Sequence, residues 1–193
     1  IVRRLVGSEM CIRDRRKWNA DRLKTDKMPV GMGVGVNTDN VVTGNIGSSK
    51  RMDFTMIGDG VNLAARLEGS CKTYGAQIII SEFTQTKLKG IYALRELDRI
   101  IVKGKTEPVS IFEVLDFHDD ETFPARMDVV GHFTEGLAHY RNTKFDDAIK
   151  SFKAALDANS EDVPSKLYID RCELFKKSPP PKDWSGEWVM TEK

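Results

Sequence analysis

The chain has 193 residues, a formal net charge of +1, 40% hydrophobic residues and 31% charged residues. This composition indicates a folded protein with room for one medium domain and a smaller one, and it excludes a disordered chain. A net charge near zero gives no reason to expect nucleic acid or an anionic membrane as a partner. The longest apolar runs are too short to span a bilayer. Three cysteines without metal-type spacing predict reduced thiols in an intracellular, cytoplasmic protein.

The first fifteen residues, "IVRRLVGSEMCIRDR", stand apart from the rest of the chain. They are basic, but they lack the apolar stretch and cleavage site of a signal peptide, and they show no clear period. The segment resembles translated adapter sequence at the ends of fragmentary environmental sequences. We therefore expect residues 1–15 to be foreign and the natural chain to be truncated at its N-terminus. Residues 16–27 predict the end of a helix, which Met28-Pro29 stops.

The next hundred residues alternate short strands and helices. "VGMGVGVNTDN" predicts a strand with one bare glycine face, against which another element packs closely. "VVTGNIGSSKRMDFTMIG" predicts a hairpin, and a helix follows from Gly58-Asp59 to Tyr74-Gly75. "AQIIIS" predicts a buried strand and "SEFTQTKLKG" a short helix capped by Ser81 and stopped by Gly90. Two more strands lie in "YALRELDRIIVKGKTEPVSIFEVL". Because the order is not strictly alternating, we expect an α+β sandwich over residues 16–117.

An acidic stretch with one proline, residues 118–128, predicts a linker. Three helical patterns follow near 129–142, 144–158 and 162–177. Within residues 129–177, small and aromatic residues have spacings that resemble a tetratricopeptide repeat: Gly136, Phe145, Ala148, Phe152 and Ala155. We therefore predict a small all-α segment, with a protein partner as one role. Residues 178–193 form a tail with three prolines and two tryptophans, Trp184 and Trp188, which we expect to dock back on a groove.

The helix that begins at Gly58-Asp59 carries two conspicuous polar residues. At about 100° per residue, Leu63, Leu67 and Cys71 share one face with Ala64. Asn62 and Arg66, one turn apart, share the opposite face with Gly69 and Ser70. A solvated polar face is the ordinary interpretation of such a helix. Small neighbours, however, leave this surface open to a ligand or a second subunit.

The stretch "GNIGS…KRMDFTMIGDGVNLAARLE", with "IIVKGKTEPVSIFEV" after it, resembles the class III nucleotidyl cyclases. The resemblance covers nearly all of residues 17–117 and implies part of a ferredoxin-like cyclase sandwich that works as a homodimer. It implies that the parent protein is an adenylate cyclase, which converts ATP to 3′,5′-cyclic AMP and pyrophosphate in signal transduction. In the family, the residues that match Asn62 and Arg66 face the nucleotide across the dimer interface. Arg66 would stabilise charge on the α-phosphate, and Asn62 would orient the ribose.

Two further residues match substrate-binding positions of the family. Lys103, in "VKGK", matches the lysine that holds the terminal phosphates, although alone it would be read as a surface lysine. Thr55, seven residues before Asn62, matches the base-reading position, where adenylate cyclases carry Asp or Thr and guanylate cyclases carry Cys. Its hydroxyl can accept a hydrogen bond from the adenine amine. Lys50 and Arg51 are further candidate phosphate contacts, but charges in a hairpin turn are usually solvated.

The resemblance also implies two Mg²⁺ or Mn²⁺ ions, held by aspartates from the first half of the domain. We expect these ligands upstream of this chain, because Asp53 and Asp59 do not match them; we expect Asp59 to cap the helix. The fragment alone should therefore be inactive and, with a sheet edge opened, poorly soluble.

Two alternatives stay open. One is a catalytically inactive, cyclase-like regulatory or scaffold protein whose helical tail binds a partner. The other is a guanylate cyclase, against which Thr55 weighs. The upstream sensor, any membrane anchor and the input signal lie outside what this sequence indicates.

Overall fold

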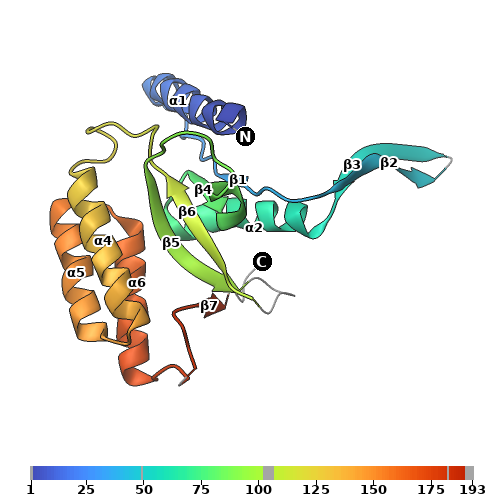
Figure 1. The fold of residues 1–193 in the computed structure, drawn as a ribbon. Helices are drawn as coiled ribbons and strands as arrows, with labels where there is room; N and C mark the ends of the chain where they lie inside the picture. Colours follow the sequence, from blue (N-terminus) through green and yellow to red (C-terminus); the bar gives the residue numbers. More distant parts are fainter. Residues whose placement is uncertain (1, 49, 102–106, 182, 190–193) are drawn as a thin grey trace.

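We describe the protein from a computed structural model, which covers residues 2–48, 50–101, 107–181 and 183–189. A five-stranded sheet forms the centre of the body, with a long N-terminal helix on one side and a two-stranded arm that leaves the other end (Figure 1). Three antiparallel helices near the C-terminus stack beside the sheet. The predicted α+β architecture is confirmed at this level.

The sheet has the strand order β1-β4-β6-β5-β7. Its strands, in chain order, are β1 (Val34–Val36), β4 (Ile78–Ser81), β5 (Leu94–Ile101), β6 (Val109–Val114) and β7 (Trp188–Val189). The pairs β1–β4 and β5–β7 are parallel, whereas β4–β6 and β5–β6 are antiparallel. The edge strand β7 comes from the extreme C-terminal tail, so residues far apart in the sequence complete one sheet.

The two faces of the sheet are covered by different helices. Helix α2 (Asp59–Tyr74) packs its Leu63 and Leu67 into one buried cluster with Ile79. On the other face Ile78 and Ile80 are buried with Ile12, which belongs to α1 (Val2–Lys24). Successive residues of a strand point to opposite faces, so the run "III" of β4 serves both layers. A strand that is buried on both sides therefore has an apolar run without alternation.

Helix α1 includes most of the segment that the sequence predicts to be foreign. It runs without a break from Val2 to Lys24, and its Ile12 is fully buried. The predicted helix end before Met28-Pro29 is confirmed. Whether residues 1–15 are foreign stays a prediction. Helical structure and one buried apolar side chain do not show where the segment comes from.

The glycine face of β1 is in contact with the backbone of α2, as the sequence predicts. A Cβ atom on Gly35 would lie 2.2 Å from the carbonyl oxygen of Ala64 and 2.4 Å from the amide nitrogen of Glu68. A Cβ atom on Gly33 would lie 2.8 Å from that of Cys71. Only glycine permits this approach, which fixes α2 against the edge of the sheet.

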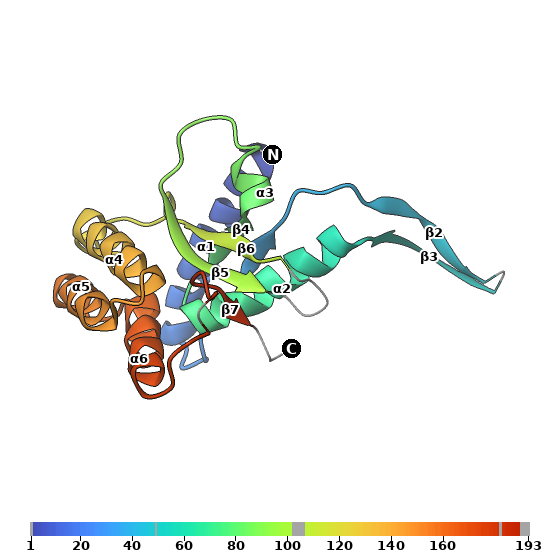
Figure 2. The ribbon, with the colours of Figure 1, turned by 60° about the horizontal axis from the view of Figure 1, so that its bottom comes forward.

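The predicted hairpin is confirmed as strands β2 (Val42–Ser48) and β3 (Arg51–Ile57), and we call it the arm. It extends away from the body, joined to it at the N-terminal end of α2 (Figure 2). The residues Met52, Phe54 and Met56 lie on one face of β3 and are 60%, 73% and 56% exposed. An isolated two-stranded hairpin is marginally stable in water, so a surface of this kind favours contact with another molecule.

The short helix α3 (Glu82–Gln85) begins as predicted, because the Ser81 side chain accepts a hydrogen bond from the amide of Thr84. Its predicted end was wrong. The helix stops at Gln85 and not at Gly90. One turn is enough here because Thr84 also donates from its hydroxyl to the carbonyl of Val36, which ties the turn to β1.

The three C-terminal helices lie close to their predicted positions, as α4 (Arg126–Arg141), α5 (Phe145–Ala158) and α6 (Val163–Lys177). Gly136 of α4 is in contact with the Phe152 ring of α5, since a Cβ atom there would lie 2.5 Å from it. A small residue thus sits where paired helices touch. The tetratricopeptide-like character of this helical segment stays a prediction, and so does its protein partner.

The prediction that both tail tryptophans dock back on the body is confirmed. Trp184 packs edge-on against Tyr140 and Phe175, with ring centroids 5.0 Å away in each case. Trp188 lies in β7, which pairs with β5, and its ring lies 4.1 Å from the Arg171 guanidinium carbon. The surface they cover is formed by the helices and the sheet edge together.

Candidate functional site

A glycine lies just outside each end of helix α2, and these two glycines set where the helix begins and ends. Gly58, with φ 154°, occupies the N-cap position and has no side chain to cap the helix. The prediction that Asp59 is the cap was therefore wrong. Asp59 is the first residue of the helix, where the positive end of the helix dipole stabilises a carboxylate. At the other end Gly75 adopts the left-handed conformation, φ 63°, that terminates helices.

Helix α2 presents one buried face and one open face. Leu63, Leu67 and Cys71 are buried as expected. Ser70 was wrongly assigned to the open face: it is 1% exposed, and its hydroxyl donates to the carbonyl of Arg66 at 2.7 Å. A serine that bonds back into its own helix can be buried at little cost, which periodicity does not reveal.

Asn62 is exposed and Arg66 is partly exposed, one helical turn apart. Within the described parts of the chain, neither side chain has a hydrogen-bond or ion-pair partner. Gly69, on the same side of the helix, is in open space, because a Cβ atom there would meet nothing within 4 Å. The two residues therefore point away from the core of their own chain, and a permanently charged guanidinium is left available to a ligand.

The loop before the arm closes over the start of α2. The Asn37 side chain donates to the carbonyl of Gly60 at 3.1 Å. The Asp39 side chain lies so near Gly60 that a Cβ atom there would come within 2.4 Å of it. The "NTDN" turn is thus anchored to the first turn of α2, which holds the helix end that precedes Asn62.

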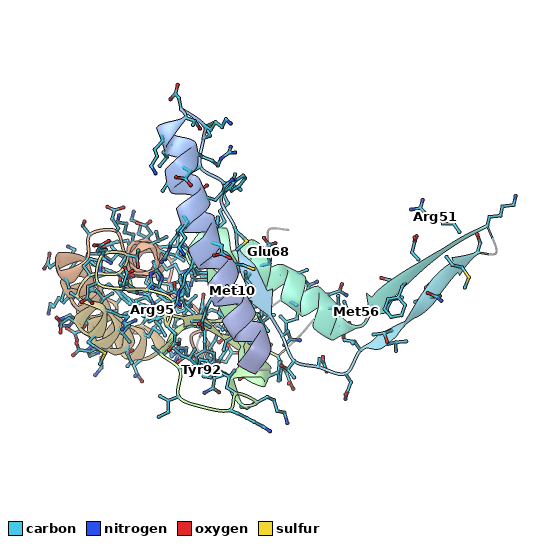
Figure 3. The ribbon with its side chains drawn as sticks, turned by 90° about the horizontal axis from the view of Figure 1, so that it is seen from above. Met10, Arg51, Met56, Glu68, Tyr92 and Arg95 are labelled. Carbon is cyan, nitrogen blue, oxygen red and sulfur yellow. The ribbon has the colours of Figure 1, made fainter. Side chains whose placement is uncertain are left out.

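Thr55 lies in β3, opposite Gly44 and partly buried, close to where the arm joins α2. Its neighbour Met56 marks this place in Figure 3. Arg51, at the far end of the arm, pairs with Asp53 at 3.2 Å while both stay exposed (Figure 3). Lys103 lies outside the described residues. The structure therefore brings Asn62 and Arg66 together on one face and places Thr55 on the adjoining arm.

Asn62, Arg66 and Thr55 do not line either of two cavities formed by described residues. One, of about 680 Å³, lies between residues 31–33, which precede β1, and the last turns of α2. The other, of about 290 Å³, lies where the sheet meets the helical segment. In the single chain Asn62 is exposed, and Arg66 and Thr55 are partly exposed.

Among the described residues no group of three or more His, Cys, Asp or Glu side chains could hold a metal ion. The residues present therefore do not supply a two-metal site. The expectation of Mg²⁺ or Mn²⁺, with ligands elsewhere in the parent protein, stays a prediction.

The sequence reasoning missed a buried ionic junction between β5 and the helical segment. Asp98 is fully buried and accepts hydrogen bonds from Arg171 of α6 at 2.6 Å and from the Tyr74 hydroxyl of α2 at 2.5 Å. Burial, followed by the charge of Asp98, raises the pKa of Tyr74 well above its ordinary value. Burial alone would lower the pKa of Arg171, but Asp98 outweighs this and raises it. The last turn of α2 is thereby joined to α6.

The same strand makes three more contacts with the helical segment. Arg95 pairs with Asp162 at the start of α6, and Arg141 of α4 pairs with Glu96 at 2.6 Å. Tyr168 donates from its hydroxyl to the carbonyl of Leu97 at 3.0 Å. The signal in the sequence was the charged run "RELDR" inside an otherwise apolar strand, which only buried partners can accommodate.

Residues 9–115 match a protein family whose description is "Adenylate and Guanylate cyclase catalytic domain". This match covers more than half of the chain. The chain belongs to this cyclase family. The matched region ends one residue after β6, so it contains strands β1, β4, β5 and β6 of the sheet, the arm, and α2 with Asn62 and Arg66, but not β7.

Several relatives are named as cyclases. The terminal-differentiation specific adenylate cyclase of Dictyostelium discoideum is 34% identical over 146 residues, which cover 74% of this chain and 7% of that protein. An adenylate cyclase of Anabaena cylindrica is 42% identical over 105 residues, which cover 51% of this chain and 21% of that protein. The crystal structure of an adenylyl cyclase from P. aeruginosa has a TM-score of 0.47 and 33% identity, covering 58% of each chain.

This cyclase chain thus spans a small part of the two curated relatives. Its alignment with the Dictyostelium protein is too long to fit within residues 1–115, so it must continue into the linker and the helical segment. The alignment therefore includes at least the beginning of the helical segment as well as part of the cyclase domain of this chain. No helix in the described ranges combines the length and the apolar character needed to cross a membrane.

Proposed function

We propose that this chain is part of an adenylate cyclase that converts ATP to 3′,5′-cyclic AMP and pyrophosphate at a site shared by two copies. The observation that supports the proposal most is the open face of α2. There Arg66 and Asn62 lie one turn apart, with no partner in the described parts of their own chain. The names of the relatives support the same reaction.

The chemistry suits these two side chains. The ribose 3′-oxygen attacks the α-phosphorus, a new P–O bond forms, and the bond to the leaving pyrophosphate breaks, so negative charge grows on the non-bridging oxygens. Arg66 offers a forked, permanently ionised donor to those oxygens. Asn62 offers an amide that can position the ribose. We assign Thr55 to the adenine amine and Lys103 to the terminal phosphates.

A second copy of the chain is the partner that the arm favours. Its apolar residues Met52, Phe54 and Met56 are exposed, although hairpins of this size need a packed face for stability. Thr55 lies on the same arm, close to α2. A copy that covers the arm would also lie beside Asn62 and Arg66, and it would convert an open surface into a cleft.

Cyclic AMP production by the parent protein tests the proposal, with ATP and Mg²⁺ or Mn²⁺. Arg66→Ala should lower kcat about a hundredfold, since loss of one such donor costs roughly 3 kcal/mol of barrier. Lys72→Ala, an exposed cation on the same helix, is the matched control and should leave kcat unchanged. Full turnover by the Arg66 variant would refute its role, and turnover of GTP in preference to ATP would refute the substrate.

A further inference from the structure

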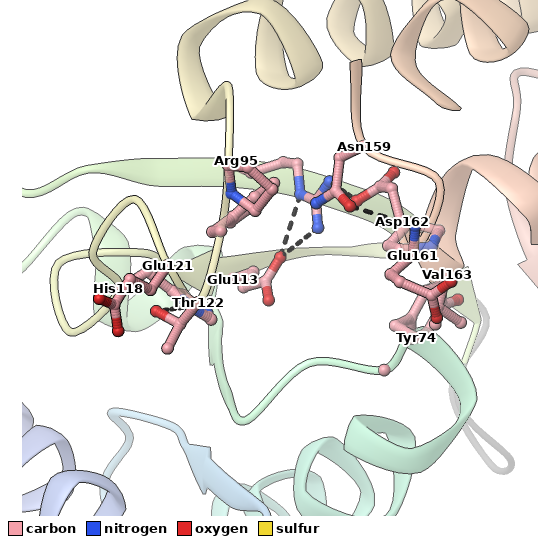
Figure 4. Close-up of a pocket in the computed structure, with 14 residues that line it drawn as sticks. Tyr74, Arg95, Glu113, His118, Glu121, Thr122, Asn159, Glu161, Asp162 and Val163 are labelled. Carbon is pink, nitrogen blue, oxygen red and sulfur yellow. Dashed lines mark hydrogen bonds and ion pairs between the residues drawn. The ribbon is translucent and has the colours of Figure 1, made fainter. Parts of the chain in front are cut away.

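The cavity of about 290 Å³ lies where the cyclase sheet meets the helical segment (Figure 4), and its lining does not include Asn62 or Arg66 of the open face of α2. Its walls come from four places: the end of α2, strands β5 and β6, the linker, and the turn between α5 and α6. Nothing in the proposed reaction uses this cavity. Its lining nevertheless contains the charged residues Arg95, Glu113 and Asp162.

Glu113 is the unusual residue in the wall. Residues 109, 111 and 113 of β6 point to the face that α2 covers, and the first two are apolar members of that core. At the third position the chain places a carboxylate that is only 4% exposed. A charge at such a position needs compensation by partners.

Arg95, the cross-strand neighbour of Glu113, gives only part of that compensation. Its Nε and Nη2 donate to the same oxygen, Oε2 of Glu113, at 3.0 and 2.6 Å. Its Nη1 donates to Asp162, whose other oxygen accepts from the amide and hydroxyl of Ser165. Oε1 of Glu113 accepts no hydrogen bond from any residue within the described ranges, and Figure 4 shows it turned away from Arg95.

The buried charges at this place do not cancel. Glu113 and Asp162 carry two negative charges, and Arg95 carries one positive charge, all at most 4% exposed. Burial raises the pKa of Glu113. A ligand that brings both a positive charge and an N–H donor would neutralise the Glu113 carboxylate.

We propose that this cavity binds a small organic cation, a primary ammonium or guanidinium on a short aliphatic chain, which donates to Oε1 of Glu113. Apolar side chains that suit the aliphatic part line the same cavity: Phe123, Pro124, Val163 and Pro164. Glu121 and Glu161 lie in its lining and add attraction for a cation. The described residues offer no three-ligand metal group, which favours an organic cation over a metal ion.

The cationic end of the ligand belongs at Glu113 and not at His118. Arg16 approaches the His118 ring at 3.4 Å, and Arg126 donates to the His118 carbonyl at 3.4 Å. These two cations make that end of the cavity unfavourable for a third. A ligand at Glu113 would contact the end of α2 and the start of α6 at once, so its binding would hold the cyclase unit and the helical segment together. The proposal does not depend on the proposed reaction.

Calorimetric titration of the full chain with n-butylammonium and n-butylguanidinium tests the proposal. Saturable binding of at least one of them is expected, with a rise in Tm that follows occupancy. Tetramethylammonium carries the same charge without an N–H donor, and n-butanol has a chain without a charge. Both should bind at least tenfold more weakly. Equal binding of all four probes, or none by the two N–H donors, would overturn the proposal.

Two variants locate the site. Glu113→Gln should weaken binding at least tenfold, whereas Glu173→Gln, an exposed carboxylate on α6, should leave it unchanged. Val163→Phe narrows the cavity without touching the buried charges, so it tests the site even if Glu113→Gln fails to fold. Undiminished binding by a folded Val163→Phe variant would place the cation elsewhere and refute the assignment.

Discussion

The arm and the junction between β5 and the helical segment invert the usual distribution of residues. The arm exposes large apolar side chains to solvent, such as Phe54 at 73%. The junction buries charges, such as Asp98 at 0% and Arg171 at 4%. Both lie within or beside the same cyclase domain. They differ in where the compensating partner comes from.

At the junction the partners belong to the same chain. Asp98 meets Arg171 and Tyr74, and Arg95 meets Glu113 and Asp162. On the arm, by contrast, residues opposite the large apolar side chains are small or polar: Thr43, Asn45 and Gly47. A buried charge without a partner costs much of the unfolding free energy, whereas an exposed apolar strand costs little. The arm can therefore await a second molecule, whereas Asp98 and Arg171 depend on each other within the chain.

The largest expected effect follows from breaking the junction. Arg171→Leu leaves Asp98 buried without its cation and also removes the contact with Trp188. Loss of one member of a buried pair typically costs about 3–5 kcal/mol of unfolding free energy. Denaturant-induced unfolding of the full chain, followed by circular dichroism, measures it.

The exposed pair Lys150–Asp147 on α5 is the matched control. Lys150→Met should leave the unfolding midpoint unchanged, because exposed pairs contribute little. If Arg171→Leu and Lys150→Met unfold at the same denaturant midpoint, the buried pair does not stabilise the fold more than the exposed pair.

A smaller effect is expected from pH. His118, at the linker end of the junction, has a pKa lowered to about 4, because of burial and then of the charges of Arg16, Arg95 and Arg126. Between about pH 4 and pH 6.5 the unfolded chain binds a proton that the folded chain excludes, so the unfolding free energy rises with pH in this window. After allowance for screening of a partly exposed ring, the gain is about 1–2 kcal/mol.

Unfolding curves of the wild type and of His118→Asn across this range isolate the effect. The difference between the two should change with pH below 6.5 and stay constant above it. A difference that does not vary with pH would show that the ring titrates alike in both states.

The smallest effect on folding, and the clearest effect on association, is expected on the arm. The double substitution Phe54→Ser with Met56→Ser should change the unfolding free energy of the monomer by less than about 0.5 kcal/mol, since both side chains are exposed. The dissociation constant for self-association should rise at least tenfold. Sedimentation velocity measures it, with Phe83→Ser, another exposed phenylalanine at 47%, as the control. An unchanged association constant would exclude the arm from the interface.

Local patterns predicted most of the elements. The hairpin, the glycine face of β1, the end of α2 at Gly75 and the three C-terminal helices all follow from periodicity and turn residues over a few positions. The polar face with Asn62 and Arg66 was also predictable, because helix geometry alone puts residues four apart on one surface. The predictions that were wrong concern Ser70, whose hydroxyl bonds within its own helix, Asp59, which follows a glycine N-cap, and Gly90, which lies beyond a helix that stops at Gln85.

The sequence by itself determined the elements and which residues share a face, because those depend on backbone geometry over one or two turns. Only the tertiary structure decided that β5 buries its charges against α2 and α6, and that β7 from the tail completes the sheet. Such contacts join residues far apart in the sequence, 24 positions for Tyr74 and Asp98 and 73 positions for Asp98 and Arg171. Their energy depends on burial and on the position of the partner, and neither is present in a local pattern.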